Sequence, residues 1–163
     1  MKIFNRKHDE NPYHGLRQQI LDIQQTQAMV GVLEGHPVFA AVVDMDMGDA
    51  IVSLASIADG TTSLYFSNGG GQLGLGQADK NIRTAALAFL RSADQILSTM
   101  PKTAEYPLPQ NGAHIVYLKT SNGIYKQEIN IKTINTAPKE IRFLNFLYQN
   151  ILTKIGEYNQ GKK

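Results

Sequence analysis

The amino-acid sequence predicts an α+β fold in which a five-stranded antiparallel sheet packs against helices. Stretches with apolar residues at every third or fourth position predict helices, and short apolar or alternating stretches predict strands. Tight-turn sequences join the strands within each group, which favours antiparallel pairing because parallel strands need long connections. The 163 residues suit one domain. The expected order is helix, three strands, helix, two strands, helix.

The first predicted helix spans residues 12–28. Asn11 is a favoured residue before a helix, and Pro12 suits the first helical position. The apolar residues of this segment recur at steps of three and four, whereas Arg17 and its glutamine neighbours fall among the polar positions. This pattern indicates an amphipathic helix, although Gly15 weakens it near the start. The expected apolar stripe consists of Tyr13, Leu16, Ile20 and Ile23.

Three predicted strands follow the first helix. Residues 38–43 form an apolar run without a polar face, which is typical of a central strand. Residues 50–57 and 63–67 form the second and third strands, and the Asp59-Gly60 pair between them is favoured in tight hairpins. We expect these strands to form an antiparallel meander.

The second predicted helix has the clearest apolar stripe in the chain and ends at Pro101. Beyond a proline-containing loop, the strands expected at residues 113–120 and 124–131 form a hairpin whose two-residue turn is Asn122-Gly123. This register places Leu118 opposite Gln127 and leaves one face of the hairpin apolar and the other nearer solvent. The helical stripe contains many small residues, namely Ala78, Ile82, Ala85, Ala86, Phe89, Ala93, Ile96, Leu97 and Met100.

The last predicted helix begins after Asn135 or Thr136 and carries Pro138 in its first turn. We expect the domain to span residues 11–158, with a flexible N-terminal segment over residues 1–10 and a flexible basic tail over residues 159–163. The apolar stripe of the last helix consists of Ile141, Leu144, Leu147, Tyr148, Ile151, Leu152 and Ile155.

The order of these elements over residues 12–157 resembles that of the small chaperones that bind type III secretion effectors. It is also similar, more loosely, to the order in profilin-like and roadblock-type sheets. The resemblance lies in element order and implies a chaperone-like protein that binds other proteins.

The composition excludes several classes of function. The chain has no Cys, which excludes disulfides, thiolate metal sites and a Cys nucleophile. Its formal net charge is only +2, and its basic residues do not form the aromatic-lined cluster of a nucleic-acid site. No apolar run reaches the length of a membrane span, and the first residues lack the apolar run of a secretion signal. We therefore expect a cytoplasmic protein without a membrane or nucleic-acid partner.

A glycine-rich segment between the third strand and the second helix is the main candidate site. Residues 69–74 match the G-x-G-x-x-G pattern, which binds phosphate where a strand leads into a helix. The surrounding antiparallel strands do not form the required parallel unit, and no Lys follows the last glycine. A structural turn is the simpler interpretation, and a ligand or partner site is the alternative. The candidate binding residues are Asn68, Gly69, Gly70, Gly71, Gln72, Gly74 and Gly76.

An acidic turn between the first two strands is a weaker candidate, for a metal site. Asp44, Asp46 and Asp49 supply three carboxylates, which hard cations prefer, but their spacing does not match the calcium-binding loop. A charged hairpin end that discourages edge pairing is the simpler interpretation. None of the histidines has the spacing of a metal-ligand motif, and no nucleophile-elbow motif is present.

Three functional hypotheses remain open. The first is a non-enzymatic protein-interaction or chaperone-like module, expected to bind a protein partner, to form a homodimer and to use no cofactor. The second is a small-ligand, nucleotide or phosphate-binding domain that uses residues 68–77. The third is an enzyme whose catalytic residues meet only in the folded chain. The lack of a catalytic motif in a well-patterned domain favours the first.

Overall fold

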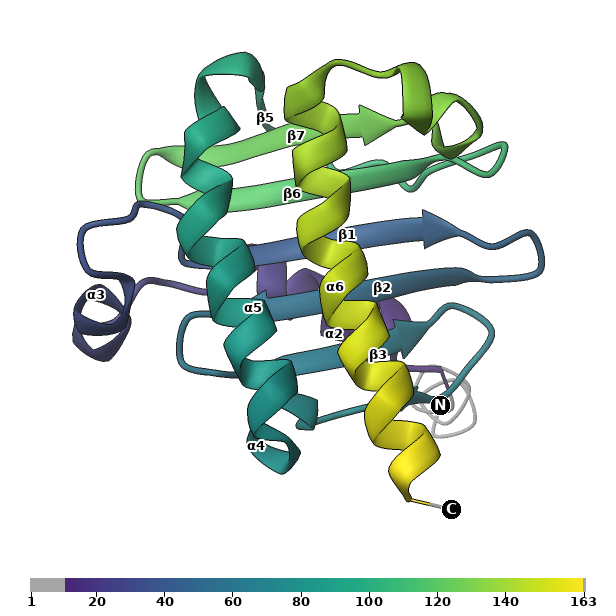
Figure 1. Cartoon of the computed structure of the whole chain (residues 1–163), viewed down its shortest axis with the longest axis horizontal. Coiled ribbons are helices and arrows are strands. Elements are labelled where there is room, and N and C mark those ends of the chain that lie inside the picture. The colour runs from purple at the N-terminus through teal and green to yellow at the C-terminus, as the bar shows by residue number, and fades with distance from the viewer. Residues whose placement is uncertain (1–10, 163) are drawn as a thin grey trace, which may run out of the picture.

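The fold consists of one antiparallel sheet with helices on both faces (Figure 1). The computed structural model describes residues 11–162. The strand order is β4-β3-β2-β1-β6-β7-β5, and every neighbouring pair is antiparallel. The long helices α5 and α6 lie side by side across one face, and α2 lies on the opposite face. The α+β class is confirmed.

The predicted number of five strands is wrong, because the sheet has seven. The two additional strands, β4 (Gly71–Gln72) and β5 (Lys102–Thr103), lie at the two edges of the sheet. Each contains only two residues, which is too short for an alternating pattern to be detected.

The expected meander is confirmed in β1 (Ala40–Asp46), β2 (Ile51–Ile57) and β3 (Thr62–Phe66). β1 also pairs with β6, so it lies at the centre of the sheet with helical layers on both sides. This position explains the apolar run of the sequence, since side chains on both faces of β1 are buried.

The second hairpin joins β6 (His114–Thr120) to β7 (Gly123–Ile129) in a register two residues from the predicted one. Thr120 pairs with Gly123, so Ser121 and Asn122 form the turn. Gly123, with φ +130°, instead begins the returning strand.

The difference of two residues changes the pairs and leaves the faces of the hairpin unchanged, because side chains alternate with period two. Leu118 pairs with Tyr125 instead of Gln127. The expected solvent-facing side of this hairpin is wrong for Ile115 and Tyr117, which are both buried on the α2 side of the sheet.

The single helix predicted over residues 12–28 is two helices, α2 (Tyr13–Asp22) and α3 (Gln27–Leu33). The chain is extended at Ile23, and Thr26 then starts α3 by accepting a hydrogen bond from the backbone N–H of Met29 at 3.3 Å. A Thr at this position stabilises a new helix start, which explains the break in an otherwise continuous apolar pattern.

The second predicted helix is also divided. A short α4 (Leu75–Ala78) ends at Asp79, α5 (Lys80–Ala93) follows, and a 3₁₀ segment, η1 (Asp94–Thr99), completes the region before Pro101. The Asp79 carboxylate accepts hydrogen bonds from the first turn of α5, so this residue ends one helix and starts the next.

The last helix, α6 (Lys139–Gly161), follows a 3₁₀ segment, η2 (Ile131–Thr136). It continues beyond the expected domain boundary at residue 158. Asn159, expected in the flexible tail, forms two reciprocal 3.1 Å amide hydrogen bonds with Gln72 of β4. The expectation for residues 1–10 concerns residues outside those described. No helix within residues 11–162 is long and apolar enough to cross a membrane.

Candidate functional site

The glycine-rich segment forms a tight turn between β3 and α4. Gly69 and Gly70 have φ values of +109° and +83°, which glycine adopts more readily than other residues. The N–H of Gly69 donates to the carbonyl of Phe66 at 3.0 Å, and the N–H of Phe66 donates to the carbonyl of Gly70 at 3.2 Å. These hydrogen bonds engage the N–H of Gly69 and the carbonyl of Gly70 within the turn itself.

Two other glycines of the segment allow close packing of the backbone. A Cβ atom at Gly71 would lie 2.5 Å from the carbonyl oxygen of Leu64, and one at Gly76 would lie 2.0 Å from that of Gly60. Gly74 has φ +68° and precedes α4, and its N–H donates to the Ser63 hydroxyl at 3.2 Å. All five glycines therefore have a structural reason to be glycine.

The N-terminus of α5 also has an internal partner. The Asp79 carboxylate accepts hydrogen bonds from the backbone N–H groups of Asn81 at 2.6 Å and Ile82 at 3.2 Å. A phosphate at this helix end would compete with the negative charge of Asp79. The side chain of Gln72, another candidate binding residue, is already hydrogen-bonded to Asn159. These contacts support the structural interpretation of residues 68–77, and ligand binding there stays a prediction.

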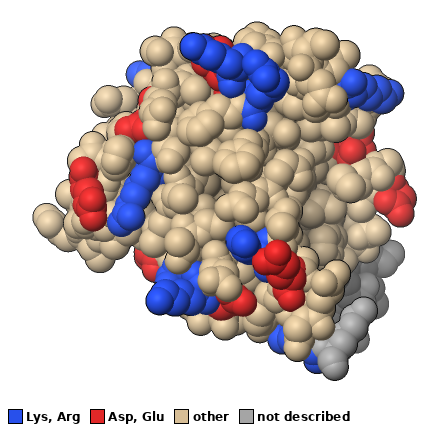
Figure 2. Space-filling view, in the orientation of Figure 1, with Lys and Arg blue, Asp and Glu red and all other residues tan. Residues whose placement is uncertain are grey.

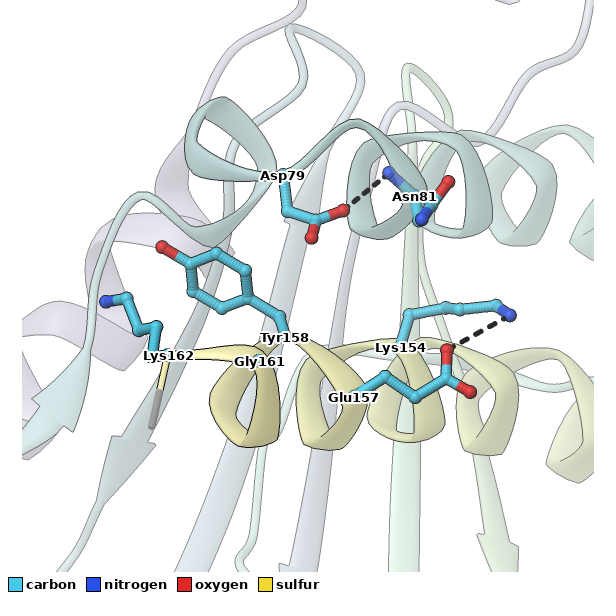
Figure 3. Close-up of a pocket in the computed structure, with 7 residues that line it drawn as sticks. All are labelled: Asp79, Asn81, Lys154, Glu157, Tyr158, Gly161 and Lys162. Carbon is cyan, nitrogen blue, oxygen red and sulfur yellow. Dashed lines mark hydrogen bonds and ion pairs between the residues drawn. The ribbon is translucent and has the colours of Figure 1, made fainter.

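An open cleft of about 310 Å³ lies beside this segment, between the start of α5 and the end of α6 (Figure 3). Lys154 lies 3.4 Å from Glu157, and the Lys162 ammonium lies 4.8 Å from the centre of the Tyr158 ring. Two carboxylates and two ammonium groups balance each other, so the cleft has no charge preference for an anion. Its lining residues are Asp79, Asn81, Lys154, Glu157, Tyr158, Gly161 and Lys162.

The three acidic candidates of the first hairpin do not form a metal site. Asp44 is fully buried and pairs with Arg17, while Asp46 accepts hydrogen bonds from the N–H groups of Gly112 at 3.0 Å and Gly48 at 2.9 Å. These hydrogen bonds, Gly112 first, lower the pKa of Asp46. Asp49 is exposed. Within residues 11–162, no three His, Asp or Glu side chains are placed to hold a metal ion.

A buried polar network lies under α2 and was not predicted from the sequence. Arg17, expected on the polar face of its helix, is buried and donates to the Asp44 carboxylate at 2.8 and 3.0 Å. Ser53 donates to the same carboxylate at 2.5 Å, and the Tyr13 hydroxyl lies 2.7 Å from Ser53 Oγ. The spacing of Tyr13, Arg17 and Ile20 along one helix face was the available signal.

This network fastens α2 and a loop to the sheet. The Arg17 guanidinium also donates to the carbonyl of Tyr106 at 2.9 Å and lies over the Tyr117 ring at 5.6 Å. Burial raises the pKa of Tyr13 and of Tyr117, so both hydroxyls stay protonated. The hollow beside Tyr117 has no room for a water molecule, so a substrate cannot reach these groups from it.

A second buried polar pair lies between the sheet and α6. His114 Nδ1 is 2.7 Å from the Tyr148 hydroxyl, and burial lowers the pKa of His114 to about 4. Burial also raises the pKa of Tyr148, so a neutral pair is stable at physiological pH. This pair joins two elements of the core and does not line the cleft between α5 and α6.

The outer face of α5 and α6 is the broadest uncharged area in the view of Figure 2, and the charged side chains lie around its margin. Residues 143–153 of α6 and residues 84–90 of α5 contain no charged side chain. Phe146 is 65% exposed on this face. The sequence signal was available, since Phe146 is absent from the core stripe predicted for this helix.

No family model, curated protein or solved structure matches the chain. The functional inference therefore depends on the geometry and chemistry of these surfaces.

Proposed function

We propose that the protein is a non-enzymatic protein-interaction module that docks a partner on the outer face of α5 and α6. The observation that carries the proposal is Phe146, which is 65% exposed within a stretch of α6, residues 143–153, that contains no charged side chain. Burying a side chain of this size contributes about 1.5–3 kcal/mol, and aromatic anchors are enriched at protein interfaces.

The helix that carries Phe146 is held firmly on the sheet. Leu144, Tyr148 and Ile151 of α6 are fully buried, so the helix cannot rotate to bury Phe146 without removing them from the core. The outward position of Phe146 is therefore a fixed property of the fold. An aromatic side chain on a fixed helix has only two rotatable bonds, so it loses little conformational freedom on binding.

Other exposed apolar side chains have different surroundings. Met47 lies in a hairpin turn, Leu73 lies between β4 and α4, and Val30 lies on the short helix α3. Single exposed apolar residues are ordinary in folded proteins. Phe146 differs because it lies in a stretch of α6, residues 143–153, that contains no charged side chain and packs beside the charge-free residues 84–90 of α5.

The non-enzymatic part of the proposal is supported by the way the buried polar groups are used. Asp44 is paired with Arg17, and His114 is paired with Tyr148, in the described part of the chain. Each pair connects elements of the fold, and neither pair lies among the residues that line the cleft between α5 and α6. These groups support the fold rather than a reaction.

Site-specific cross-linking tests the proposal. A photo-reactive phenylalanine analogue is placed at position 146 and, in a control chain, at position 73, where Leu73 is 66% exposed. We expect light-induced adducts, made in cells that produce the protein, from position 146 and far fewer from position 73. Absent adducts at position 146, or equal yields at both positions, would contradict the proposed docking face.

A further inference from the structure

We infer that the partner on this face is a second copy of the chain, with α6 of one copy packed antiparallel to α6 of the other. The inference rests on the proposed function and names the partner for the same surface. It follows from the order of side chains along the outward side of α6.

Seven residues of α6 form a continuous outward stripe, which we call the outer stripe. Their spacing of three and four residues keeps them on one side of a helix and matches the spacing in helix–helix seams. All are exposed or half-buried, whereas Leu144, Tyr148 and Ile151 point into the core. The outer stripe consists of Lys139, Arg142, Phe146, Asn150, Thr153, Glu157 and Gln160.

The outer stripe is self-complementary when two copies run antiparallel. With the two-fold axis between positions 149 and 150, Arg142 lies opposite Glu157 of the second copy, and Phe146 lies opposite Thr153. Each of these pairs occurs twice, because a two-fold interface repeats every contact. The Asn150 and Gln149 amides next to the axis can both donate and accept hydrogen bonds, so identical groups can pair there.

A parallel arrangement of the same helices is unfavourable. It would place Arg142 beside Arg142 and Glu157 beside Glu157, and like charges at such distances repel. It would also align the two helix dipoles in the same direction. The charge order along α6 therefore favours the antiparallel copy over the parallel one.

The charged residues of the outer stripe are available for this contact. Arg142 uses one guanidinium N–H, Nε, to donate to the carbonyl of Ala137 at 3.1 Å, which leaves its other donors free to bind a carboxylate. Glu157 is 59% exposed, and its 3.4 Å contact with Lys154 is a surface pair of small energy. Neither group must leave a buried partner.

The dimensions are those of a helix-mediated dimer. With 23 residues and a rise of 1.5 Å per residue, α6 is about 35 Å long. The neighbouring exposed residues of α5, Thr84 and Ala88, are small and uncharged, so they leave room for a second helix to approach α6. A contact of this length is compatible with the roughly 1,200–2,000 Å² buried in a typical stable interface.

A charge-exchange experiment tests the inference. The variants Arg142→Glu and Glu157→Arg each place like charges opposite each other in their own dimers. Mixed in equal amounts, they place Glu opposite Arg at both contacts. We expect each variant alone to dimerise at least about tenfold more weakly than wild type at low salt, and the mixture to recover most of the wild-type affinity.

Native mass spectrometry with one variant isotopically labelled measures the mixed dimer directly, and circular dichroism controls for folding of both surface variants. A monomeric wild type would overturn the inference of a second copy, and cross-links from position 146 to another protein would still support the proposed function. A wild-type dimer that neither variant weakens, or that the mixture fails to restore, would overturn the antiparallel α6 contact.

Discussion

Replacing Arg17 by Met tests whether the buried ion pair fastens α2 to the sheet. The Arg17 side chain is 8% exposed and Asp44 is fully buried, with 2.8 Å between Nη2 and the carboxylate. Arg17→Met keeps an unbranched apolar side chain and removes the charged guanidinium, so the Asp44 carboxylate retains only its hydrogen bond from Ser53. Breaking a buried pair in this way costs about 3–5 kcal/mol, a large part of the stability of a typical domain.

Urea unfolding followed by circular dichroism measures this loss of unfolding free energy. The exposed position Gln19 on the same helix provides the control, and Gln19→Met is expected to change stability by less than about 0.5 kcal/mol. The double variant Arg17→Met with Asp44→Asn should recover about half of the loss, because no unpaired charge remains buried. A loss below about 1 kcal/mol for Arg17→Met, or no recovery in the double variant, would refute this explanation.

Two further predictions concern a glycine contact and a buried histidine. Gly76→Ala should lower the unfolding free energy by about 3 kcal/mol, because the new Cβ atom would lie 2.0 Å from a backbone oxygen. Gly156 lies in open space on α6, so the control Gly156→Ala should raise the unfolding free energy by up to about 1 kcal/mol. Similar effects at both positions would contradict the packing argument. The pKa of His114 is lowered from 6.5 to about 4 in the folded chain, so on acidification the imidazole binds a proton in the unfolded chain before it does so in the folded chain. The unfolding free energy should therefore fall by about 2 kcal/mol as the pH falls from 6.5 to about 4, a value that allows for solvent screening. Denaturant titrations at several pH values should show a smaller fall in unfolding free energy for His114→Gln than for the wild type. Equal falls would show that His114 is not the group responsible.

The main strands could be predicted because their signals are local. The apolar run of β1 and the Asp59-Gly60 turn each lie within a few residues, and the meander followed from them. The pairing of β1 with β6 joins residues 69 to 79 positions apart, and no local pattern specifies it. The two-residue strands β4 and β5 form only because longer neighbours offer free edges.

The errors in the helices have a different cause. The apolar spacing continues through Ile23, so periodicity alone extends the first helix, whereas the hydrogen bond to Thr26 begins another. Arg17 was assigned to the polar face because of its charge, and its partner Asp44 lies 27 residues away in the sequence. A polar side chain can be recognised as buried only when the fold brings its partner to it.

One candidate site could be seen in the sequence, and the other could be seen only in the structure. The glycine segment was conspicuous in the sequence, and the structure gives each of its glycines a conformational or packing role. The outer face of α6 was not predicted, because the apolar stripe of that helix marks only its buried side. Phe146 becomes informative only when the opposite side of α6 is known to be fixed on the sheet.

The mass of the protein in solution tests the central claim most directly. Sedimentation equilibrium of the wild-type chain, over a wide range of concentrations, should give about twice the 18.0 kDa of one chain. Phe146→Asp should sediment as a monomer, and Leu73→Asp, altered at an equally exposed site, should remain dimeric. A wild-type mass of one chain at all concentrations, or a dimer that persists in Phe146→Asp, would contradict the account.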